Sequence, residues 1–354
     1  MKRVFVAMSG GVDSSVTAAL LKRRGFDVVG AYIKCYNLDG CSERDVEDAR
    51  RVAEQLDIPF YVFDLEKDYK DRVVKYMIDE YANGRTPNPD VMCNKEIKFG
   101  LFLQRALALG ADYVATGHYV GLKSSTNNES LTNKRIFVNS QKIRYSLMAA
   151  KDKNKDQSYF LWTLTQDQLK HCLFPIGDYL KPQVRLMAKK WGLITADKKD
   201  SQGICFLGKV TLADFLKNYI PEKRGVVLST AGEAIGEHNG SHLYTIGQRH
   251  GFGIGGFSRP LYVAEKHISE NKLVVAEGKD NPMLYQKEIE LKDINIIAPG
   301  KVSLVRLRYR QPLAKADLKE NRVIFKTPQK FVAPGQSAVF YSPAGELLGG
   351  GIIK

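Results

Sequence analysis

Residues Arg3–Arg24 read RVFVAMSGGVDSSVTAALLKRR and combine two different hydrophobic periods. The run RVFVAM, Arg3–Met8, is almost continuously apolar, which is typical of a strand that is buried on both faces. From Ser14 to Arg24 the apolar residues recur at helical spacing, and Gly25 follows as a stop signal. A buried strand, a glycine turn and a helix in this order predict the first unit of a parallel α/β sheet.

The same alternation of strands and helices continues along the first half of the chain. Strands that alternate with amphipathic helices predict a parallel sheet that helices cover on both faces. The further predicted strands are residues 28–33, 60–64 and 113–116, and the predicted helices are residues 46–56, 69–81, 97–109, 158–171 and 182–191.

The pattern changes at about Gly208. Short apolar runs separated by glycine-rich turns, such as GVVLSTAGEAIGEH and SHLYTIGQRHGFGIGG, predict strands rather than helices. A last group of strands includes VSLVRLRYR and QSAVFYSPAGELLGGGII. We therefore predict an α/β N-terminal domain over residues 1–207, followed by two smaller β-rich domains over residues 208–284 and 285–354.

The chain has 354 residues, a net charge of +14 and a pI near 9.4. The positive electrostatic field of such a charge attracts polyanions, and nucleic acid is the leading candidate. The alternative is a basic protein without a polyanionic partner. No apolar run reaches the roughly 18–20 residues of a transmembrane helix, and we expect no membrane association. The five scattered cysteines (Cys35, Cys41, Cys93, Cys172, Cys205) do not resemble a secreted disulfide framework, so we expect a cytoplasmic protein with reduced thiols.

The loop between the first strand and the first helix reads SGGVDSS, Ser9–Ser15. Two glycines let the backbone approach a ligand, and the helix N-terminus behind them presents N–H groups and positive potential to a pyrophosphate. Asp13 is a candidate for orienting the loop or holding Mg²⁺, and the GK[ST] ending of a Walker loop is absent. The competing interpretation, an N-capped helix after a glycine turn, is disfavoured by the position at the first strand–helix junction.

Cys93 and Cys205 have unusual surroundings for cysteines. Cys93 lies in RTPNPDVMCNKEIKF, Arg85–Phe99, where two prolines predict an extended, turn-rich loop, and Cys205 follows a Ser-Gln-Gly turn in KKDSQGICFLG. Neither has a CxxC partner or a histidine at ligand spacing, so we predict no zinc site. Nearby lysines favour the thiolate, which makes both residues candidates for sulfur chemistry rather than for the core.

Motifs along the whole chain resemble those of a known family. SGGVDSS alone matches the pyrophosphatase loop of ATP pyrophosphatases, which include several synthetases and tRNA-thiolating enzymes. Together with PNPDVMCNKEIKF, ATGHY, KDQSYFLW, KPQVR, DSQGICF, GQRHGFGIGG, RYRQ and PGQSAVFY, in this order, it makes the chain resemble the tRNA-specific 2-thiouridylases. The resemblance implies an adenine nucleotide alpha hydrolase-like N-terminal domain and a C-terminal β-barrel that contacts tRNA. It also implies ATP-dependent 2-thiolation of the wobble uridine of tRNA, with Mg²⁺ bound together with ATP.

The resemblance further implies functions for individual residues. Cys93 and Cys205 would be the catalytic thiols, with a persulfide on Cys205 and a Cys93–Cys205 disulfide formed during the reaction. Asn88, Pro89 and Asp90 would contact the flipped target base. The implied partners are tRNA and a sulfur-relay protein that donates the persulfide, and we otherwise expect a monomer.

The remaining implied residues bind ATP or tRNA. Ile33 stands where the family pattern leads us to expect a methionine beside the adenine. The implied ATP-binding residues are Ala7, Met8, Ser9, Gly10, Gly11, Val12, Asp13, Ser14, Ile33 and Gly117, and the implied tRNA contacts are His118, Lys155, Asp156, Gln157, Arg308, Tyr309 and Gln336.

Arg306, Arg308 and Arg310 alternate along the predicted strand VSLVRLRYR. Alternation places all three side chains on one face of a strand. Two interpretations stay open, which are a stripe that follows the tRNA backbone and a solvated strand face.

Other chemistries also stay open. Asp90, Cys93 and Cys205 are candidates for holding an iron–sulfur cluster whose open iron carries the sulfur. An amidating ATP pyrophosphatase would leave the two cysteines and the basic C-terminal region unexplained. A non-catalytic RNA-binding protein would be expected to have a degraded SGGVDSS loop, whereas the loop is complete.

Overall fold

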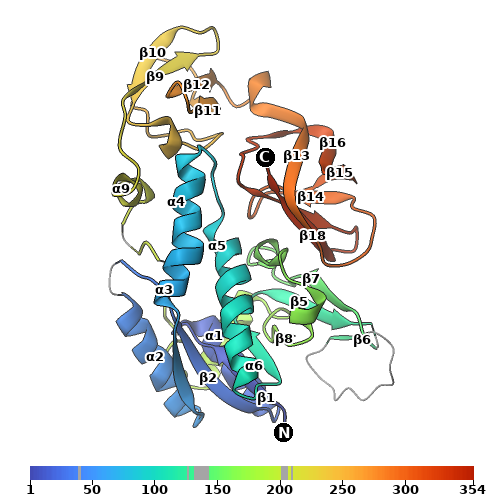
Figure 1. Ribbon diagram of the computed structural model, residues 1–354. Helices are drawn as coiled ribbons and strands as arrows, with labels where there is room; N and C mark the ends of the chain where they lie inside the picture. Colours follow the sequence, from blue (N-terminus) through green and yellow to red (C-terminus); the bar gives the residue numbers. More distant parts are fainter. Residues whose placement is uncertain (39–40, 126, 131–142, 201–205, 209) are drawn as a thin grey trace.

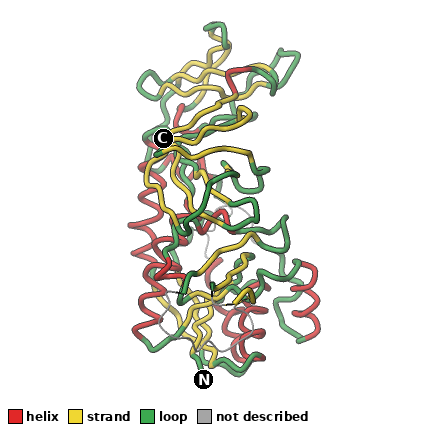
Figure 2. Tube along the Cα trace, turned by 90° about the vertical axis from the view of Figure 1, so that its right-hand side faces the viewer, coloured by secondary structure: helices red, strands yellow, loops and turns green. Residues whose placement is uncertain are grey.

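The computed structural model describes residues 1–38, 41–125, 127–130, 143–200, 206–208 and 210–354, and Cys205 lies outside these ranges. The α/β part lies at the N-terminal end of the molecule, and a four-stranded sheet lies at the opposite end (Figures 1 and 2). A β-barrel lies between these ends, beside the helix of residues 75–82 that reaches the four-stranded sheet (Figure 1). Among the described residues, no helix is long and apolar enough to cross a membrane.

The N-terminal sheet has the strand order β3-β2-β1-β4-β8, and all neighbouring strands are parallel. This confirms the predicted parallel sheet. Sequence patterns did not predict the last strand, because it is only two residues long. The strands are β1 (Arg3–Ala7), β2 (Asp27–Lys34), β3 (Phe60–Asp64), β4 (Tyr113–Thr116) and β8 (Cys172–Leu173).

Helices cover both faces of this sheet, as predicted. Alternate residues of β1 enter different cores, since Val4 and Val6 pack in one cluster and Phe5 packs in the other. The first face is covered by α1 (Val12–Arg23), α2 (Cys41–Gln55) and α8 (Lys181–Lys190). The second is covered by two continuous helical segments, namely α3 (Glu66–Tyr69), η1 (Lys70–Val74) and α4 (Lys75–Ala82), then α5 (Pro89–Met92), η2 (Cys93–Phe102) and α6 (Leu103–Ala108).

The helical segment that starts at Pro89 corrects the prediction of an extended, turn-rich loop that continues until a helix begins at residue 97. Asn88 caps the helix, because its side-chain oxygen accepts a hydrogen bond from the Val91 N–H at 3.2 Å. Pro89 occupies the first helical turn, where a proline loses no helical hydrogen bond. The proline therefore starts a helix here rather than preventing one.

The predicted helix over residues 158–171 is also wrong. This region holds a 3₁₀ turn, η3 (Ser158–Leu161), and one short helix, α7 (Gln166–Leu169), before β8 begins. Thr165 caps α7 by accepting a hydrogen bond from the Gln168 N–H, so the chain reorients there instead of continuing one helix.

The second half of the chain confirms the two β-rich parts. A small sheet, with the order β6-β5-β7, precedes them. The central sheet has the order β10-β9-β12-β11, and β13 to β18 form a closed barrel. The elements are β5 (Val120–Ser124), β6 (Asn127–Ser130), β7 (Tyr145–Ala149), α9 (Leu212–Lys217), β9 (Gly225–Ser229), β10 (Ala234–His238), η4 (Ser241–Leu243), β11 (Leu261–His267), β12 (Lys272–Glu277), η5 (Pro282–Leu284), β13 (Tyr285–Ile296), β14 (Leu304–Arg306), β15 (Ala314–Lys319), β16 (Arg322–Lys330), β17 (Ser337–Tyr341) and β18 (Leu347–Ile353).

Candidate active site

The nucleotide loop lies between β1 and α1 and is shaped by its own residues. Gly10 has φ +68°, and a Cβ at this position would lie 2.4 Å from the carbonyl oxygen of Asp45. Gly11 is the N-cap of α1, and the Ser14 hydroxyl donates to the Gly11 carbonyl at 3.1 Å. The Ser9 N–H donates to the Ser14 Oγ at 3.1 Å. This arrangement directs the first turn of α1 toward the loop, which is the geometry of an anion site at a helix N-terminus.

Gly117 follows β4 and lies against the nucleotide loop. A Cβ at Gly117 would lie 2.8 Å from the backbone nitrogen of Ser14 and 2.9 Å from the carbonyl carbon of Asp13. Any larger residue would therefore push the loop away from the end of β4. The predicted assignment of Gly117 to the nucleotide site is consistent with this contact.

The other predicted ATP-binding residues lie at the same edge of the sheet. Ala7 ends β1, and Met8 follows it with its N–H donating to the Ala31 carbonyl at 2.7 Å. Val12 begins α1, and Ile33 lies at the carboxyl end of β2, where it is partly buried. Ligands of open parallel sheets bind at the carboxyl ends of the strands, so the structure brings the predicted nucleotide residues to the expected place.

Asp13 is the acidic centre of the loop. Its carboxylate accepts hydrogen bonds from the Tyr119 hydroxyl at 2.8 Å and from the Lys181 ammonium group at 2.8 Å to each oxygen. Burial, together with the negative charge of Asp13, raises the pKa of Tyr119 above its usual range, so this hydroxyl stays protonated and donates. Neither partner was among the predicted site residues.

Lys181 also joins Asp13 to Asp200, which closes an extended charge network. The Lys181 Nζ lies 2.8 Å from an Asp200 oxygen, and Asp200 also pairs with Lys155 at 2.6 Å and Arg185 at 2.9 Å. Burial alone would raise the pKa of Asp200, but hydrogen bonds from Lys155 and Lys181 outweigh it and lower the pKa to about 2. Lys155, a predicted tRNA contact, therefore pairs with a carboxylate in this structure.

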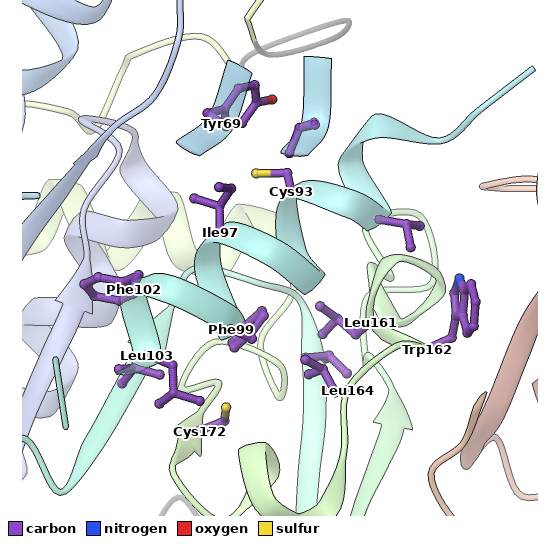
Figure 3. Close-up of a cluster of buried hydrophobic side chains, with 14 of the residues drawn as sticks. Tyr69, Cys93, Ile97, Phe99, Phe102, Leu103, Leu161, Trp162, Leu164 and Cys172 are labelled. Atoms are coloured by element: carbon purple, nitrogen blue, oxygen red, sulfur yellow. The ribbon is translucent and has the colours of Figure 1, made fainter. Parts of the chain in front are cut away.

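Cys93 lies in the hydrophobic core, which corrects its predicted place in a polar turn. It is 6% exposed, and its side chain lies near Tyr69 and Ile97 (Figure 3). Residues four apart share one helix face, so Cys93 and Ile97 point inward while the exposed Lys95 between them points outward. The polar neighbours that suggested a turn are thus the solvent face of a helix.

Phe206, the residue that directly follows Cys205 in the chain, belongs to the same core. Its ring is buried, and the ring centroid lies 5.8 Å from that of Tyr69. Tyr69, Phe206 and Cys93 belong to one hydrophobic cluster. Cys205, the other predicted catalytic cysteine, lies outside the described residues.

Asp90 and His118 lie near the same lysine, Lys98. Burial raises the pKa of Asp90, and the charge of Lys98 opposes that effect. Burial lowers the pKa of His118, and Lys98 lowers it further, so His118 is neutral. The Nδ1 atom of His118 lies 2.8 Å from the Thr116 hydroxyl. In this structure His118 is a buried neutral residue with a hydrogen-bond partner.

Asp156 and Gln157, predicted to contact tRNA, make internal hydrogen bonds. Asp156 is buried, accepts backbone N–H groups from Ala150 and Ser158, and pairs with Arg306 of the barrel at 3.1 Å. The Gln157 side chain accepts a hydrogen bond from the backbone N–H of Tyr119 at 3.0 Å.

The interpretation of Arg306, Arg308 and Arg310 as a stripe on one strand face is wrong. Strand β14 ends at Arg306, and Arg306 faces the buried Asp156. Arg308 lies beyond the strand, is partly buried with a lowered pKa as a result, and donates to the Ile246 carbonyl at 2.6 Å. The alternation fails because the strand stops before the second arginine.

The last predicted tRNA contacts also lie at internal interfaces. The ring of Tyr309 lies 4.6 Å from that of Phe160, measured between centroids. The Gln336 amide donates to the backbone carbonyls of Thr86 and Pro87 at 2.9 and 3.1 Å. The residues that prediction missed individually, Tyr119, Lys181 and Asp200, all lie inside the quoted motifs ATGHY, KPQVR and DSQGICF, so the motifs held a signal for them.

Comparison with known proteins assigns the whole chain. Residues 2–209 match a family model described as a tRNA methyl transferase HUP domain, residues 213–277 match its PRC-barrel domain, and residues 286–353 match an aminomethyltransferase beta-barrel domain. The curated relatives include proteins named tRNA-specific 2-thiouridylase MnmA. That of Streptococcus mutans is 45% identical and covers 99% of this chain and 95% of its own, that of Listeria monocytogenes is 46% identical and covers 99% and 94%, and that of Christiangramia forsetii is 40% identical and covers all of both chains. The chain therefore belongs to the family of tRNA-specific 2-thiouridylases.

Proposed function

We propose that this protein converts a uridine of tRNA into 2-thiouridine at the expense of ATP. The observation that carries the proposal is the likeness, along the whole chain, to relatives named for this reaction. A complete SGGVDSS loop at the start of α1 supports the use of ATP, and a net charge of +14 suits a polyanionic substrate.

In the first step, the C2 oxygen of the uridine attacks the α-phosphorus of ATP, and pyrophosphate leaves. The oxygen then carries AMP, which makes it a good leaving group. The loop Ser9–Ser14 and the N-terminus of α1 would hold the phosphates. Asp13 offers the carboxylate oxygens that Mg²⁺ prefers, and the ion would supply charge neutralisation at the phosphates.

In the second step, the terminal sulfur of a Cys205 persulfide attacks C2, and the bond between C2 and the oxygen that carries AMP breaks. The Cys93 thiolate attacks the Cys205 sulfur, so the transferred sulfur stays on the base and a Cys93–Cys205 disulfide forms. A thiol reductant then restores both cysteines, and a sulfur-relay protein donates the next persulfide. The packing of Phe206 on Tyr69, in the cluster that contains Cys93, supports the use of these two cysteines together.

An iron–sulfur cluster held by Asp90, Cys93 and Cys205 is the alternative sulfur carrier. Burial favours the protonated form of Asp90, which is a poorer ligand than a carboxylate. Iron analysis and the visible spectrum of anaerobically purified protein distinguish the two carriers.

Several finer assignments belong to the same proposal. The target would be the wobble uridine, the protein would act in the cytoplasm as a monomer apart from tRNA, and its domains would span residues 1–207, 208–284 and 285–354. Asn88, Pro89 and Asp90 would hold the flipped base, because they lie at the start of the helix that carries Cys93.

The test is nucleoside mass spectrometry of tRNA from cells that lack this gene and its 2-thiouridine, complemented with variants. We expect wild type to restore 2-thiouridine and Cys93→Ala and Cys205→Ala to fail. Cys172→Ala is the matched control, because it removes another buried thiol of the same cluster. Failure of wild type would overturn the proposed function, whereas restoration by either of the first two variants would overturn only the two-cysteine mechanism.

A further inference from the structure

Residues 84–88 lie where the three parts of the molecule meet. Gly84, at the end of the helical segment of α4, has φ +70°, and a Cβ there would lie 2.2 Å from Ile268 of the central part. The Thr86 hydroxyl lies 3.1 Å from the hydroxyl of Thr245, also in the central part, and the Thr86 N–H donates to the carbonyl of Pro334 in the barrel at 2.7 Å. The segment that leads into the proposed base pocket is thus contacted from both β-rich parts.

Gln336 of the barrel makes the most direct of these contacts. Its amide nitrogen donates to the Thr86 carbonyl at 2.9 Å and to the Pro87 carbonyl at 3.1 Å. A side-chain amide has two N–H donors, so both are used on this segment. The backbone carbonyl of Gln336 accepts a hydrogen bond from the Ile353 N–H at 2.8 Å. This bond connects the turn that contains Gln336 to strand β18.

The segment needs such a donor because its own sequence supplies few. Pro87 and Pro89 have no backbone N–H, so the segment around Asn88 has little capacity to form a hydrogen-bonded turn of its own. Buried carbonyls without a donor are costly, and Gln336 supplies donors to two consecutive ones. Close packing adds to this, since a Cβ at Gly335 would lie 2.9 Å from both the N and the O of Thr86.

We propose that Gln336 is a positioning residue for thiolation, which holds Asn88, Pro89 and Asp90 in their working place through the carbonyls of Thr86 and Pro87. The inference rests on the proposed function, and it differs from a tRNA contact at Gln336. Because both N–H donors are occupied, donation from this amide to tRNA would require release of the loop. A positioning residue affects kcat, whereas a tRNA contact affects tRNA affinity.

The experiment compares Gln336→Glu and Gln336→Met with wild type. Both variants keep the length of the side chain and remove its donors, and the second adds no charge. We expect kcat for thiolation to fall by about tenfold or more, because misplaced substrate-binding groups cost rate steeply, while the Kd for tRNA changes less than about twofold. Gln336→Lys, which restores a donor, is expected to recover part of kcat.

A second readout needs no activity. Amide hydrogen exchange without tRNA is expected to become faster at Thr86 and at Val91, the N–H held by the Asn88 cap, in both donor-free variants. The matched control is Gln329→Met, because the amide of this other barrel glutamine donates to the Thr327 carbonyl within its own strand, at 2.8 Å. The control is expected to match wild type in exchange, kcat and Kd.

The outcomes separate the two proposals. Unchanged kcat with a weakened Kd for tRNA, or unchanged exchange at Thr86 and Val91, would overturn the positioning function while leaving thiolation intact. If wild type forms no 2-thiouridine, the proposed function fails, and the exchange data alone then decide whether Gln336 holds the loop. If Gln336→Glu does not fold, Gln336→Met makes the same comparison.

Discussion

The nucleotide loop and the segment before Cys93 are held by hydrogen bonds to their backbone from residues at very different separations in sequence. Within the nucleotide loop, the hydrogen bonds among Ser9, Gly11 and Ser14 join residues at most five positions apart. Thr86 and Pro87 are held by Gln336, which is 250 and 249 positions away. The hydrogen bonds that hold the backbone of the first loop come from neighbours in sequence, although the Asp13 carboxylate also binds the distant Tyr119 and Lys181. The carbonyls of the second segment are held by the barrel.

This difference separates two kinds of function. A phosphate-binding loop must keep one shape, and short-range hydrogen bonds at a helix N-terminus provide it. The proposed pocket for a flipped base would have to match an RNA that also touches other parts of the protein. Fixing that pocket from another domain makes its geometry depend on how the domains are joined.

Substitution of Gly10 tests the nucleotide-loop side of the comparison and should have the largest effect. Gly10→Ala forces a positive φ on alanine and places its Cβ 2.4 Å from the Asp45 carbonyl oxygen, so the loop must move. We expect thiolation to fall by at least about 100-fold and the free energy of unfolding to fall by about 2–4 kcal/mol. Single-turnover kinetics and urea denaturation measure the two effects.

The neighbouring glycine is the control for this change. Gly11 has φ −96°, and a Cβ there would meet only the Ser9 hydroxyl, at 3.5 Å. Gly11→Ala should therefore lose less than about 1 kcal/mol of stability. Equal destabilisation by the two variants would show that Gly10 is not needed for its backbone conformation.

Substitution of Arg306 breaks a long-range contact between the barrel and the N-terminal part. Arg306→Met leaves the Asp156 side chain, which is 1% exposed, without its charged partner. We expect a loss of about 3 kcal/mol in the free energy of unfolding, measured by urea denaturation. Arg322→Met is the matched control, because its pair with Glu288 is exposed and worth less than about 1 kcal/mol. Similar losses for both variants would contradict the interpretation that the buried Asp156–Arg306 pair stabilises the contact between the N-terminal part and the barrel.

Substitution of Lys181 tests the charge network behind the nucleotide loop. Lys181→Met leaves Asp13 and Asp200 without their shared cation, and since both carboxylates are about one-third exposed we expect a loss of about 1–2 kcal/mol. The network should weaken with acid in wild type, since the stability from the lowered pKa of Asp200 is present above pH 3.8 and is lost as the pH falls toward about 2.

The acid-induced loss of stability should be smaller in Lys181→Met than in wild type. Lys189→Met, which removes an exposed ion pair with Asp197, provides the baseline for both measurements. A Lys181→Met protein with the stability and acid profile of this baseline would show that the network contributes nothing.

The smallest expected effect is the pH dependence that comes from His118. Its pKa is lowered by burial, so the unfolded chain takes up a proton below about pH 6.5 that the folded protein does not. Wild type should therefore lose stability as the pH falls from 7.5 to 5, and His118→Gln should lose less of it. Substitution of the exposed His250 by Gln should leave the slope unchanged. Equal slopes in wild type and His118→Gln, measured by denaturation at both pH values, would contradict a buried neutral His118.

The same contrast in range explains which features could be predicted from sequence. The parallel sheet, its helices and the nucleotide loop follow from hydrophobic period and from glycines at one strand–helix junction, which are local signals. Pro89 was misread because a proline that starts a helix and a proline in a turn look alike until the cap at Asn88 is seen. The alternation of Arg306 and Arg308 was misread because local sequence does not show where a barrel strand ends.

Residues whose partners are distant in sequence could be named but not placed. Gln336 and Asp156 both lie in recognisable motifs, and the motifs carry no information about which backbone or side chain they contact. Their partners, Thr86 and Arg306, belong to other parts of the molecule. Burial of Cys93 follows from a helix face that the loop prediction had hidden.

The tie between Gln336 and Ile353 has a consequence for how the enzyme is made. A ribosome releases the nucleotide loop well before β18, the strand that secures the Gln336 turn. Until this strand is made, the turn that presents Gln336 to the Thr86 and Pro87 carbonyls would lack its contact with Ile353. Synthesis of β18, rather than of the N-terminal part alone, would therefore be the step that fixes the segment before Cys93.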